Sequence, residues 1–393
     1  MGCKPQFSFL VFRGNAAATP HSDIWQQRLP SDRSLLPASL DSSVTYGEYF
    51  TAVQAFLENA GCELILRAIG ERFGPQITPD SIHKIQVSLE KHGEFYHPSH
   101  LQVHTRQGEI SFVLNVAVSE TGMRHITDEY HFLQQLNNEF TRSYLPEVYG
   151  LGESLKAGNG RIGMFLGQWF EGYHEFHLNL NPADGGYRTA VWHPSRGRLY
   201  LSPEQTLDLY RQVAGILAYY YNVETLAQIF PWHHAAGDFI VRVDDTGLDV
   251  KLITVRRYAP LLTNLPLPQD SAPNPELILH ALLIFFLSLS IRTRLDRLDG
   301  VGELAWADPS VVEPTLTGFM EGLALKPPVP SMPDTIERCF QYYLSVCTRQ
   351  DLGELIHGIA NTYNPDSSEH RVIHHNIDEH IETLSGAVQR FIS

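Results

Sequence analysis

The spacing of apolar residues changes along this chain, and that change limits the fold more than any single motif. Residues 82–118 alternate apolar and polar side chains with a period of two and contain two short turns. Such alternation is typical of half-buried β-strands, so three antiparallel strands are expected here. A helix is expected from about 127 to 138, and two more strands over 145–152 and 161–170. The first half therefore predicts an antiparallel sheet, with one helix between its third and fourth strands.

The second half predicts mostly helices. Ser202-Pro203-Glu204 begins a helix that runs to about Tyr221, because serine is a good N-cap and proline suits the first turn. Two short strands are expected at Phe239–Val243 and Leu248–Ile253, and helices dominate from about Asn274. A sheet-rich half followed by a helix-rich half predicts an α+β protein of two lobes with a cleft between them.

The remaining segments flank these lobes. The first 44 residues are rich in Pro, Ser, Ala and Asp and hold one apolar cluster, so a flexible or loosely packed leader is expected. Apolar residues then recur at helical spacing up to Gly74-Pro75, which predicts a helical extension. The expected parts are a leader (1–44), a helical extension (45–81), a sheet-rich lobe (82–172), a helical lobe (173–325), and a linker with C-terminal helices (326–393).

Composition excludes some classes of partner. The chain has 29 basic and 44 acidic residues, for a net charge of -15, so a nucleic-acid partner is not expected. The longest apolar run, 278–291, contains His280 and is too short to span a bilayer. No secretory signal is evident, and the four cysteines include no CxxC pair. A cytoplasmic protein without a membrane partner is therefore expected.

The segment FPWHHAAGDFIV at 230–241 is the clearest candidate site. It places two histidines, a glycine and an aspartate directly before a run of strand-forming residues. A rigid strand can hold the side chains of the preceding loop in position, and histidine suits proton transfer near neutral pH. Arg256-Arg257 is the densest basic spot nearby. It is expected to hold an acidic ligand group or, more commonly, to pair with an Asp or Glu.

Four segments carry a resemblance to a known family. They are FVLNVAVSETGMRHITDEYHFLQQL (112–136), GMFLGQWFEGY (163–173), FPWHHAAGDFIV (230–241) and VKLITVRRY (250–258). Their order and spacing, across roughly residues 82–325, resemble the protein-kinase-like fold, nearest to its aminoglycoside phosphotransferase and choline kinase branch. The resemblance implies a five-stranded antiparallel N-lobe sheet with one helix, a helical C-lobe, and ATP with Mg²⁺ or Mn²⁺ as cofactor.

The resemblance also implies a role for particular positions. In the family, a lysine on the third strand holds the phosphates and pairs with a glutamate of the next helix. A loop aspartate accepts the substrate proton, an asparagine five residues later binds metal, and an aspartate after the hairpin binds the principal metal. The matching positions here are Asn115, Glu129, His233, Asp238 and Thr254, in that order.

Other positions are less direct matches. The glycine-rich loop reduces to 90–94, where Lys91 and Gly93 remain as candidates for phosphate contact. The hinge that would contact a base falls on Gln168, Trp169 and Phe170. Glu129 has an alternative interpretation as a capping carboxylate in the first turn of its helix.

A second register is open for the candidate loop. Gly237-Asp238 would then end the catalytic triplet, but this leaves no room for the first strand of the following hairpin. The spacing of the strands favours the register that places His233 at the loop aspartate and Asp238 at the metal asparagine.

Substitution of these groups decides the functional interpretation. Phosphoryl transfer depends on positioned charge, and losing one charged or hydrogen-bonding group commonly costs on the order of 10² to 10³ in rate. The lysine, the base, the principal metal aspartate and most of the glycine loop are replaced here. The sequence therefore predicts a pseudokinase that is retained for ligand binding, regulation or scaffolding. Its partner would be a small molecule, a nucleotide or a protein, and ATP binding would be weak or absent.

Three alternatives stay open. The first is an unorthodox phosphotransferase with His233 as base and Asp238 as the only metal carboxylate. The second is a metal-binding or hydrolytic module that uses His233, His234 and Asp238. The third is a binding module without a small-molecule site, in which residues 369–380 place histidines and carboxylates four residues apart on a helix.

Overall fold

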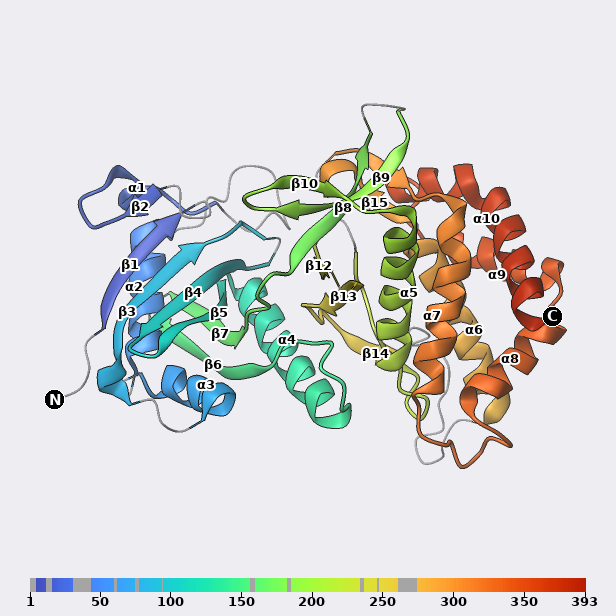
Figure 1. Ribbon diagram of the computed structural model, residues 1–393, viewed down its shortest axis with the longest axis horizontal. Helices are drawn as coiled ribbons and strands as arrows, with labels where there is room; N and C mark the ends of the chain where they lie inside the picture. The colour runs from blue at the N-terminus through green and yellow to red at the C-terminus, as the bar shows by residue number, and fades with distance from the viewer. Residues whose placement is uncertain are drawn as a thin grey trace. The chain divides into compact units, whose positions relative to one another are not determined.

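The computed structural model has a mixed α+β fold, as the sequence predicts (Figure 1). It divides into two compact units, Met1–Glu171 and Gly172–Ser393. The structure describes residues 5–11, 16–30, 44–59, 62–74, 78–93, 95–155, 160–181, 185–233, 237–245, 247–260, 274–300 and 302–393.

The first unit is built on a seven-stranded sheet with the order β2-β1-β3-β4-β5-β7-β6. Strands β3 to β7 pair antiparallel, and their order along the chain is the one predicted, with a helix between β5 and β6. The strands are β1 (Gln6–Val11), β2 (Ala16–Ala18), β3 (Ile82–Leu89), β4 (His97–Thr105), β5 (Gly108–Ala117), β6 (Val148–Leu155) and β7 (Arg161–Gln168).

The prediction of a five-stranded sheet was wrong because part of the expected leader joins it. Strand β1 runs parallel to β3, with Gln6 opposite Lys84 and Val11 opposite Leu89. Val11 is fully buried, and Phe7 and Phe9 pack against the core. The apolar cluster of the leader therefore covers the edge of β3, and these residues are not loosely packed. Residues 1–4, 12–15 and 31–43 of the leader lie outside the described residues.

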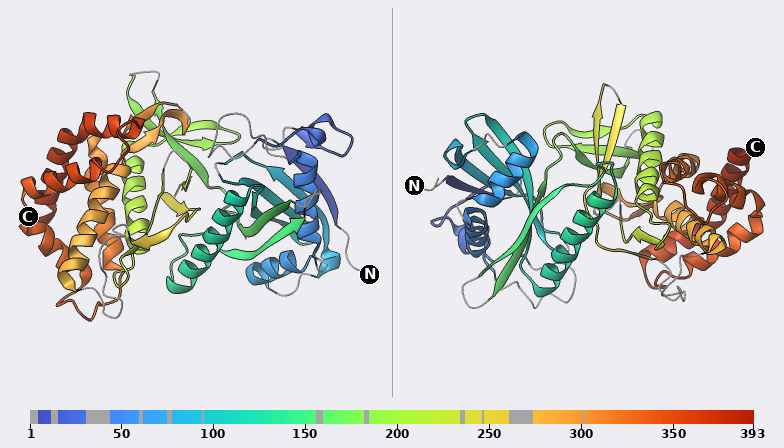
Figure 2. Two further views of the ribbon diagram at one scale, coloured as in Figure 1. Left: turned by 180° about the vertical axis from the view of Figure 1, so that it is seen from behind. Right: turned by 90° about the horizontal axis from the view of Figure 1, so that it is seen from below.

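Helices cover both faces of this sheet (Figure 2). A Cβ on Gly152 of β6 would contact Phe56 of α2, whereas a Cβ on Gly163 of β7 would contact Met123 and Ile126 of α4. Helices α2 and α3 thus lie on one face and α4 on the other. The helices of this unit are α1 (Asp23–Gln26), α2 (Tyr46–Glu58), α3 (Glu63–Phe73), the short 3₁₀-helix η2 (Pro79–Ser81) and α4 (Glu120–Glu139).

The second unit contains a sheet that the sequence predicted only in part. Its order is β10-β9-β8-β12-β13. The β12–β13 hairpin was expected, but β8 to β10 were not, because their apolar alternation extends over only a few residues each. The strands are β8 (His174–Leu180), β9 (Tyr187–His193), β10 (Gly197–Tyr200), β12 (Phe239–Asp244) and β13 (Gly247–Leu252), with the small pairs β11 (Ala227–Ile229) and β14 (Tyr258–Pro260), and β15 (Leu295–Arg297) and β16 (Leu304–Trp306).

Helices make up most of the rest of this unit. Ser202 caps α5 in a capping box with Gln205, where the helix start was predicted. Among the described helices, only α6 has the length and apolar composition to cross a membrane, and 56% of it is buried, as in an ordinary core helix. The helices are α5 (Pro203–Tyr219), α6 (Pro275–Arg292), α7 (Val312–Ala324), α8 (Ile336–Val346), α9 (Arg349–Ala360) and α10 (Ser368–Ile392), with the 3₁₀-helices η4 (Leu298–Gly300) and η5 (Pro309–Val311).

Helices α5 and α7 approach each other through glycines and lie side by side (Figure 1). A Cβ on Gly318 would lie 1.8 Å from the backbone oxygen of Arg211, and one on Gly322 would lie 2.5 Å from the backbone oxygen of Gly215. No side chain fits in this contact without moving one helix. The glycines therefore set the distance between the two helices.

This contact gives a prediction for Gly318→Ala. The added methyl group should lower the free energy of unfolding by about 1–3 kcal/mol, the usual cost of overpacking. Gly358→Ala in α9 is the matched control, because Gly358 is exposed and its Cβ would meet nothing within 4 Å. The control should stabilise the protein by up to about 1 kcal/mol through helix propensity. Urea unfolding of both variants makes the measurement, and equal effects would contradict the packing argument.

Candidate functional site

The candidate loop leads directly into the β12–β13 hairpin. Phe239 pairs with Leu252, and the Ile253 N–H donates to the Asp238 carbonyl at 2.8 Å, so the pairing continues one residue past the strands. Thr254 therefore follows the residue that faces Asp238. The His233 N–H also donates to Asp238 Oδ2 at 2.8 Å. The structure thus brings His233 and Asp238 together, at the end of the hairpin where Thr254 also lies.

Asp238 is held by Arg256. The Arg256 Nη1 and Nη2 groups donate to Asp238 Oδ2 and Oδ1 at 2.5 and 2.6 Å. The Asp238 side chain is 2% exposed and that of Arg256 is 20% exposed. Both carboxylate oxygens are engaged, and Oδ2 accepts a second bond from the His233 N–H. A divalent cation at this carboxylate would have to compete with the guanidinium for its oxygens.

His233 lies in a basic environment. Burial, followed by the charge of Arg292, lowers the pKa of His233 to about 4; the charge of Asp238 opposes this shift, and those of Arg256 and Arg297 add to it. The ring is therefore neutral at pH 7. Because a general base is most effective when its pKa lies near the working pH, His233 is poorly matched to that role.

Thr254 supplies no metal ligand of the expected kind. Thr254 is 6% exposed, and its hydroxyl makes no hydrogen bond with the described part of the chain. It is neutral, so it cannot replace the metal-binding carboxylate. His234 lies outside the described residues. Across the residues that the structure describes, no group of three or more His, Cys, Asp or Glu side chains is arranged to hold a metal ion.

A buried acid–histidine cluster lies next to the loop. His177 is 2% exposed, with Nδ1 3.3 Å from Asp296 Oδ1 and Nε2 3.8 Å from Glu175 Oε2. A Cβ on Gly237 would lie 2.7 Å from the Glu175 carboxyl carbon, so Glu175 touches the loop directly. Burial alone would lower the pKa of His177, but hydrogen bonds and charges from Asp296 and Glu175 raise it to about 9. The ring is a buried cation between two carboxylates.

Sequence reasoning missed this cluster. Glu175 and His177 lie two residues apart in the sequence, but their segment alone specifies no reaction. Asp296 lies 119 residues after His177 in the chain. No spacing rule links residues so far apart, so the pairing could be seen only in the fold.

In the first unit, Asn115 faces α4. It lies opposite Phe165 in the β5–β7 pair, and the Phe165 ring is 6.0 Å from the Tyr130 ring of α4. Residues opposite each other in a sheet point to the same face. Glu129 also lies in α4 and is 1% exposed. The structure therefore places Asn115 and Glu129 on facing elements, with an uncharged amide at the strand position.

The capping interpretation of Glu129 was wrong. Helix α4 begins at Glu120, well before the predicted start at 127, because the Ser119 hydroxyl accepts a hydrogen bond from the Gly122 N–H at 3.0 Å. Glu129 consequently lies in the middle of the helix rather than in its first turn.

The turn between β3 and β4 is fastened to the core. His92 Nε2 lies 3.2 Å from the Tyr46 hydroxyl of α2, and His92 Nδ1 lies 3.1 Å from His97 Nδ1. The Gly93 N–H donates to the Tyr96 carbonyl at 3.1 Å. Lys91 is exposed. The resemblance implies that backbone N–H groups of this turn contact phosphate. The N–H of its one glycine, Gly93, instead bonds within the turn.

The hinge positions are also engaged within the first unit. The Gln168 N–H donates to the Glu147 carbonyl at 2.8 Å. The Trp169 ring stacks on His100 of β4, with centroids 4.1 Å apart and planes 18° apart. Burial lowers the pKa of His100. Phe170 is half-buried. The His100 ring therefore covers one face of the Trp169 ring, and a flat ligand could not stack on that face.

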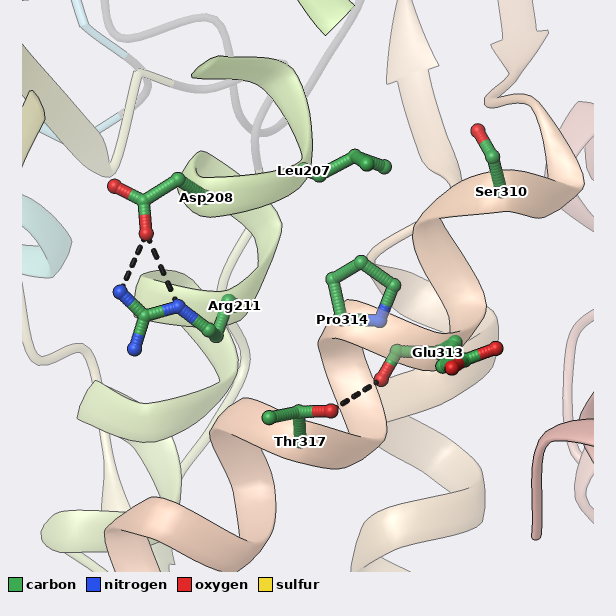
Figure 3. Close-up of a pocket in the computed structure, with 7 residues that line it drawn as sticks. All are labelled: Leu207, Asp208, Arg211, Ser310, Glu313, Pro314 and Thr317. Carbon is green, nitrogen blue, oxygen red and sulfur yellow. Dashed lines mark hydrogen bonds and ion pairs between the residues drawn. The ribbon is translucent and has the colours of Figure 1, made fainter. Parts of the chain in front are cut away.

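A separate pocket of about 410 Å³ lies between α5 and α7 (Figure 3). Arg211 pairs there with Asp208 and with Glu321, both at 2.5 Å. None of the residues predicted from the sequence lines it, and its charges are paired within the protein. The lining residues are Leu207, Asp208, Arg211, Ser310, Glu313, Pro314 and Thr317.

Comparisons with known proteins give distant structural similarities alone. No family model and no curated protein matches the chain. A solved structure described as "WaaP in complex with acyl carrier protein" is similar over 71% of this chain and 90% of that chain, at 10% sequence identity and a TM-score of 0.31. A TM-score this low does not establish a shared fold.

The Asp238–Arg256 pair gives a stability prediction. Arg256→Ala should lower the free energy of unfolding by about 3–5 kcal/mol, because it leaves a buried carboxylate without its cation. Asp238→Asn should cost less, because Arg256 is 20% exposed and can reach water. The double variant should cost less than the sum of the two. Guanidinium unfolding of the three variants tests this, and strict additivity would contradict it.

His177 gives a pH prediction. Its folded pKa of about 9 lies above the ordinary value of 6.5. Its contribution to stability is therefore fully present below about pH 6.5 and is lost as the pH rises through 9. The loss should be roughly 3 kcal/mol, at about 1.4 kcal/mol per pKa unit.

The measurement compares urea unfolding of the wild type and His177→Gln between pH 6 and pH 10. The difference in unfolding free energy between them should shrink as the pH rises. A difference that does not depend on pH would show that His177 is not charged in the folded protein.

Proposed function

We propose that this chain has a kinase-like fold that has lost orthodox phosphoryl transfer, and that it acts as a pseudokinase in ligand binding, regulation or scaffolding. The order of elements supports the fold: three antiparallel strands, helix α4 and two more strands in the first unit, then helix α5 and the β12–β13 hairpin in the second. The aminoglycoside phosphotransferase and choline kinase branch remains part of this proposal.

One observation carries the loss of activity. The Asp238 carboxylate stands where the resemblance places a metal ligand, and Arg256 neutralises it through two hydrogen bonds at 2.5 and 2.6 Å. Mg²⁺ prefers carboxylate and phosphate oxygens in near-octahedral geometry. The only carboxylate among the three loop and hairpin positions already has its cation, and that cation is part of the protein.

The other positions support the same conclusion. Asn115 is uncharged where the family has lysine, and Thr254 is uncharged where it has the principal metal aspartate. His233, with its pKa lowered to about 4, is a weak base at the position of the loop aspartate. Each loss of such a group typically reduces the rate on the order of 10² to 10³. Together these losses disfavour the unorthodox phosphotransferase that would depend on His233 and Asp238.

A thermal-shift titration tests the proposal. The wild type is mixed with ATP, ADP or GTP, each with and without Mg²⁺ or Mn²⁺. A ligand at 100 times its Kd should stabilise the folded state by about 2.7 kcal/mol, which a rise in Tm readily reports. We expect any nucleotide shift to be the same with and without the metal, and no transfer of phosphate from ATP.

Two variants make the test specific. Asp238→Asn should leave every nucleotide shift unchanged, as should Asp245→Asn, the matched control in the exposed β12–β13 turn. A metal-dependent rise in Tm that Asp238→Asn abolishes and Asp245→Asn retains would show a working metal site and overturn the proposal.

A further inference from the structure

Four of the eight large apolar side chains that are exposed in the described chain lie on the neighbouring strands β8, β9 and β10 of the second unit. Grouped exposure of this kind marks interaction surfaces more often than scattered single residues do. These four residues are Leu180 (53%), Tyr187 (49%), Leu199 (37%) and Tyr200 (40%).

Strand β10 is one of the two edge strands of its sheet (Figure 1). The Leu201 N–H donates to the Thr189 carbonyl at 3.0 Å. Bonded and non-bonded pairs alternate in an antiparallel ladder, so Leu199 is also bonded to β9, while Arg198 and Tyr200 direct their N–H and C=O groups away from it. No strand within the described ranges pairs with that outer side. Two backbone N–H groups and two carbonyls of β10 thus form an open edge.

The hairpin is basic in an acidic chain. Residues 185–201 contain Arg188, Arg196 and Arg198 and no Asp or Glu, whereas the whole chain has a net charge of -15. Arg198 pairs with Asp299 at 3.0 Å, with both side chains at least 41% exposed. Exposed ion pairs contribute little to stability, so a carboxylate from another molecule could replace this one at small cost. The charge of the hairpin favours an acidic partner.

Edge strands are usually protected against pairing by charges, prolines or a covering segment. Strand β10 has four residues and one charge, Arg198, but the proline of the hairpin, Pro194, lies in the turn, and residues 194–200 are all exposed. Leu199 and Tyr200 keep half of β10 apolar. The strand therefore combines open backbone groups, apolar contact area and positive charge.

We propose that β10 docks an acidic, extended segment of a partner protein, which adds to the sheet as a new strand. Its backbone would bond to the outward groups of Arg198 and Tyr200, and its carboxylates would lie near the arginines of the hairpin. Strand addition of this kind takes its affinity from the main chain and its specificity from side chains. The inference is independent of the proposed loss of phosphoryl transfer.

Peptide binding tests the charge and the strand geometry together. The probe is a fluorescein-labelled hexapeptide of alternating glutamate and valine, followed by fluorescence anisotropy with the full chain. The controls are the same peptide with lysine for glutamate and a version N-methylated at alternate residues. We expect the acidic peptide to bind at least tenfold more tightly than either control, and more weakly as salt rises. Equal binding of the acidic and basic peptides would overturn the proposal.

Two variants at one position separate the backbone from the side chain. Tyr200→Pro removes an N–H that points outward, a position that proline tolerates in an edge strand. Tyr200→Ala keeps that N–H. The proline variant should lose at least tenfold more affinity than the alanine variant, and the exposed Arg196→Glu should also weaken binding. Equal affinities of the two folded Tyr200 variants would overturn the proposal. If Tyr200→Pro does not fold, the N-methylated peptide decides: binding equal to that of the unmodified peptide overturns strand addition.

Size-exclusion chromatography with light scattering distinguishes another occupant. A wild-type dimer that Tyr200→Pro converts to a monomer would show that β10 pairs with a second copy of this chain, and would overturn the assignment to an acidic partner. A monomeric wild type that binds the acidic peptide supports that assignment.

Discussion

The bidentate contact between Asp238 and Arg256 determines what the candidate site can do. A carboxylate with 2% exposure is costly to keep charged unless a cation and hydrogen bonds compensate for the lost water. Arg256 supplies that cation, and the His233 N–H supplies a third hydrogen bond. The contact also joins the segment before β12 to the segment after β13, so the position of the loop backbone depends on it. A metal ion at this carboxylate would compete with an interaction that the fold itself uses.

Two neighbouring histidines show how far local charge controls this region. His233 and His177 both lose water on burial, yet the pKa of the first falls to about 4 while that of the second rises to about 9. The charge of Arg292 adds to the effect of burial at His233, whereas Asp296 and Glu175 flank His177. Glu175 touches the loop at Gly237, so these opposite environments adjoin each other. Each buried charge in this part of the unit has a partner within the protein, which is the arrangement of a stable structure rather than of a site prepared for a charged substrate.

How much of this could be predicted depends on the distance between interacting residues in the chain. The β12–β13 hairpin and the start of α5 follow from local alternation and from the Ser202-Pro203 cap, and both are present. The spacing of His233 and Asp238 to the hairpin was also local. The parallel pairing of β1 with β3 and the contact of His177 with Asp296 join distant segments. Neither contact can be recognised from the spacing of residues in the sequence, because its two partners lie far apart in the chain.

In the proposed interpretation, a binding role costs this chain less stability than phosphoryl transfer would. Catalysis of that reaction needs several charges held in low-dielectric surroundings without internal partners, and such charges destabilise a protein. In the proposed interpretation, Asn115, Thr254 and an internal ion pair stand at the positions of such charges, without that cost. An open strand edge costs less stability, because water forms hydrogen bonds with its N–H and C=O groups until a partner binds. The paired charges around the candidate loop and the exposed edge of β10 therefore fit the proposed binding role better than phosphoryl transfer.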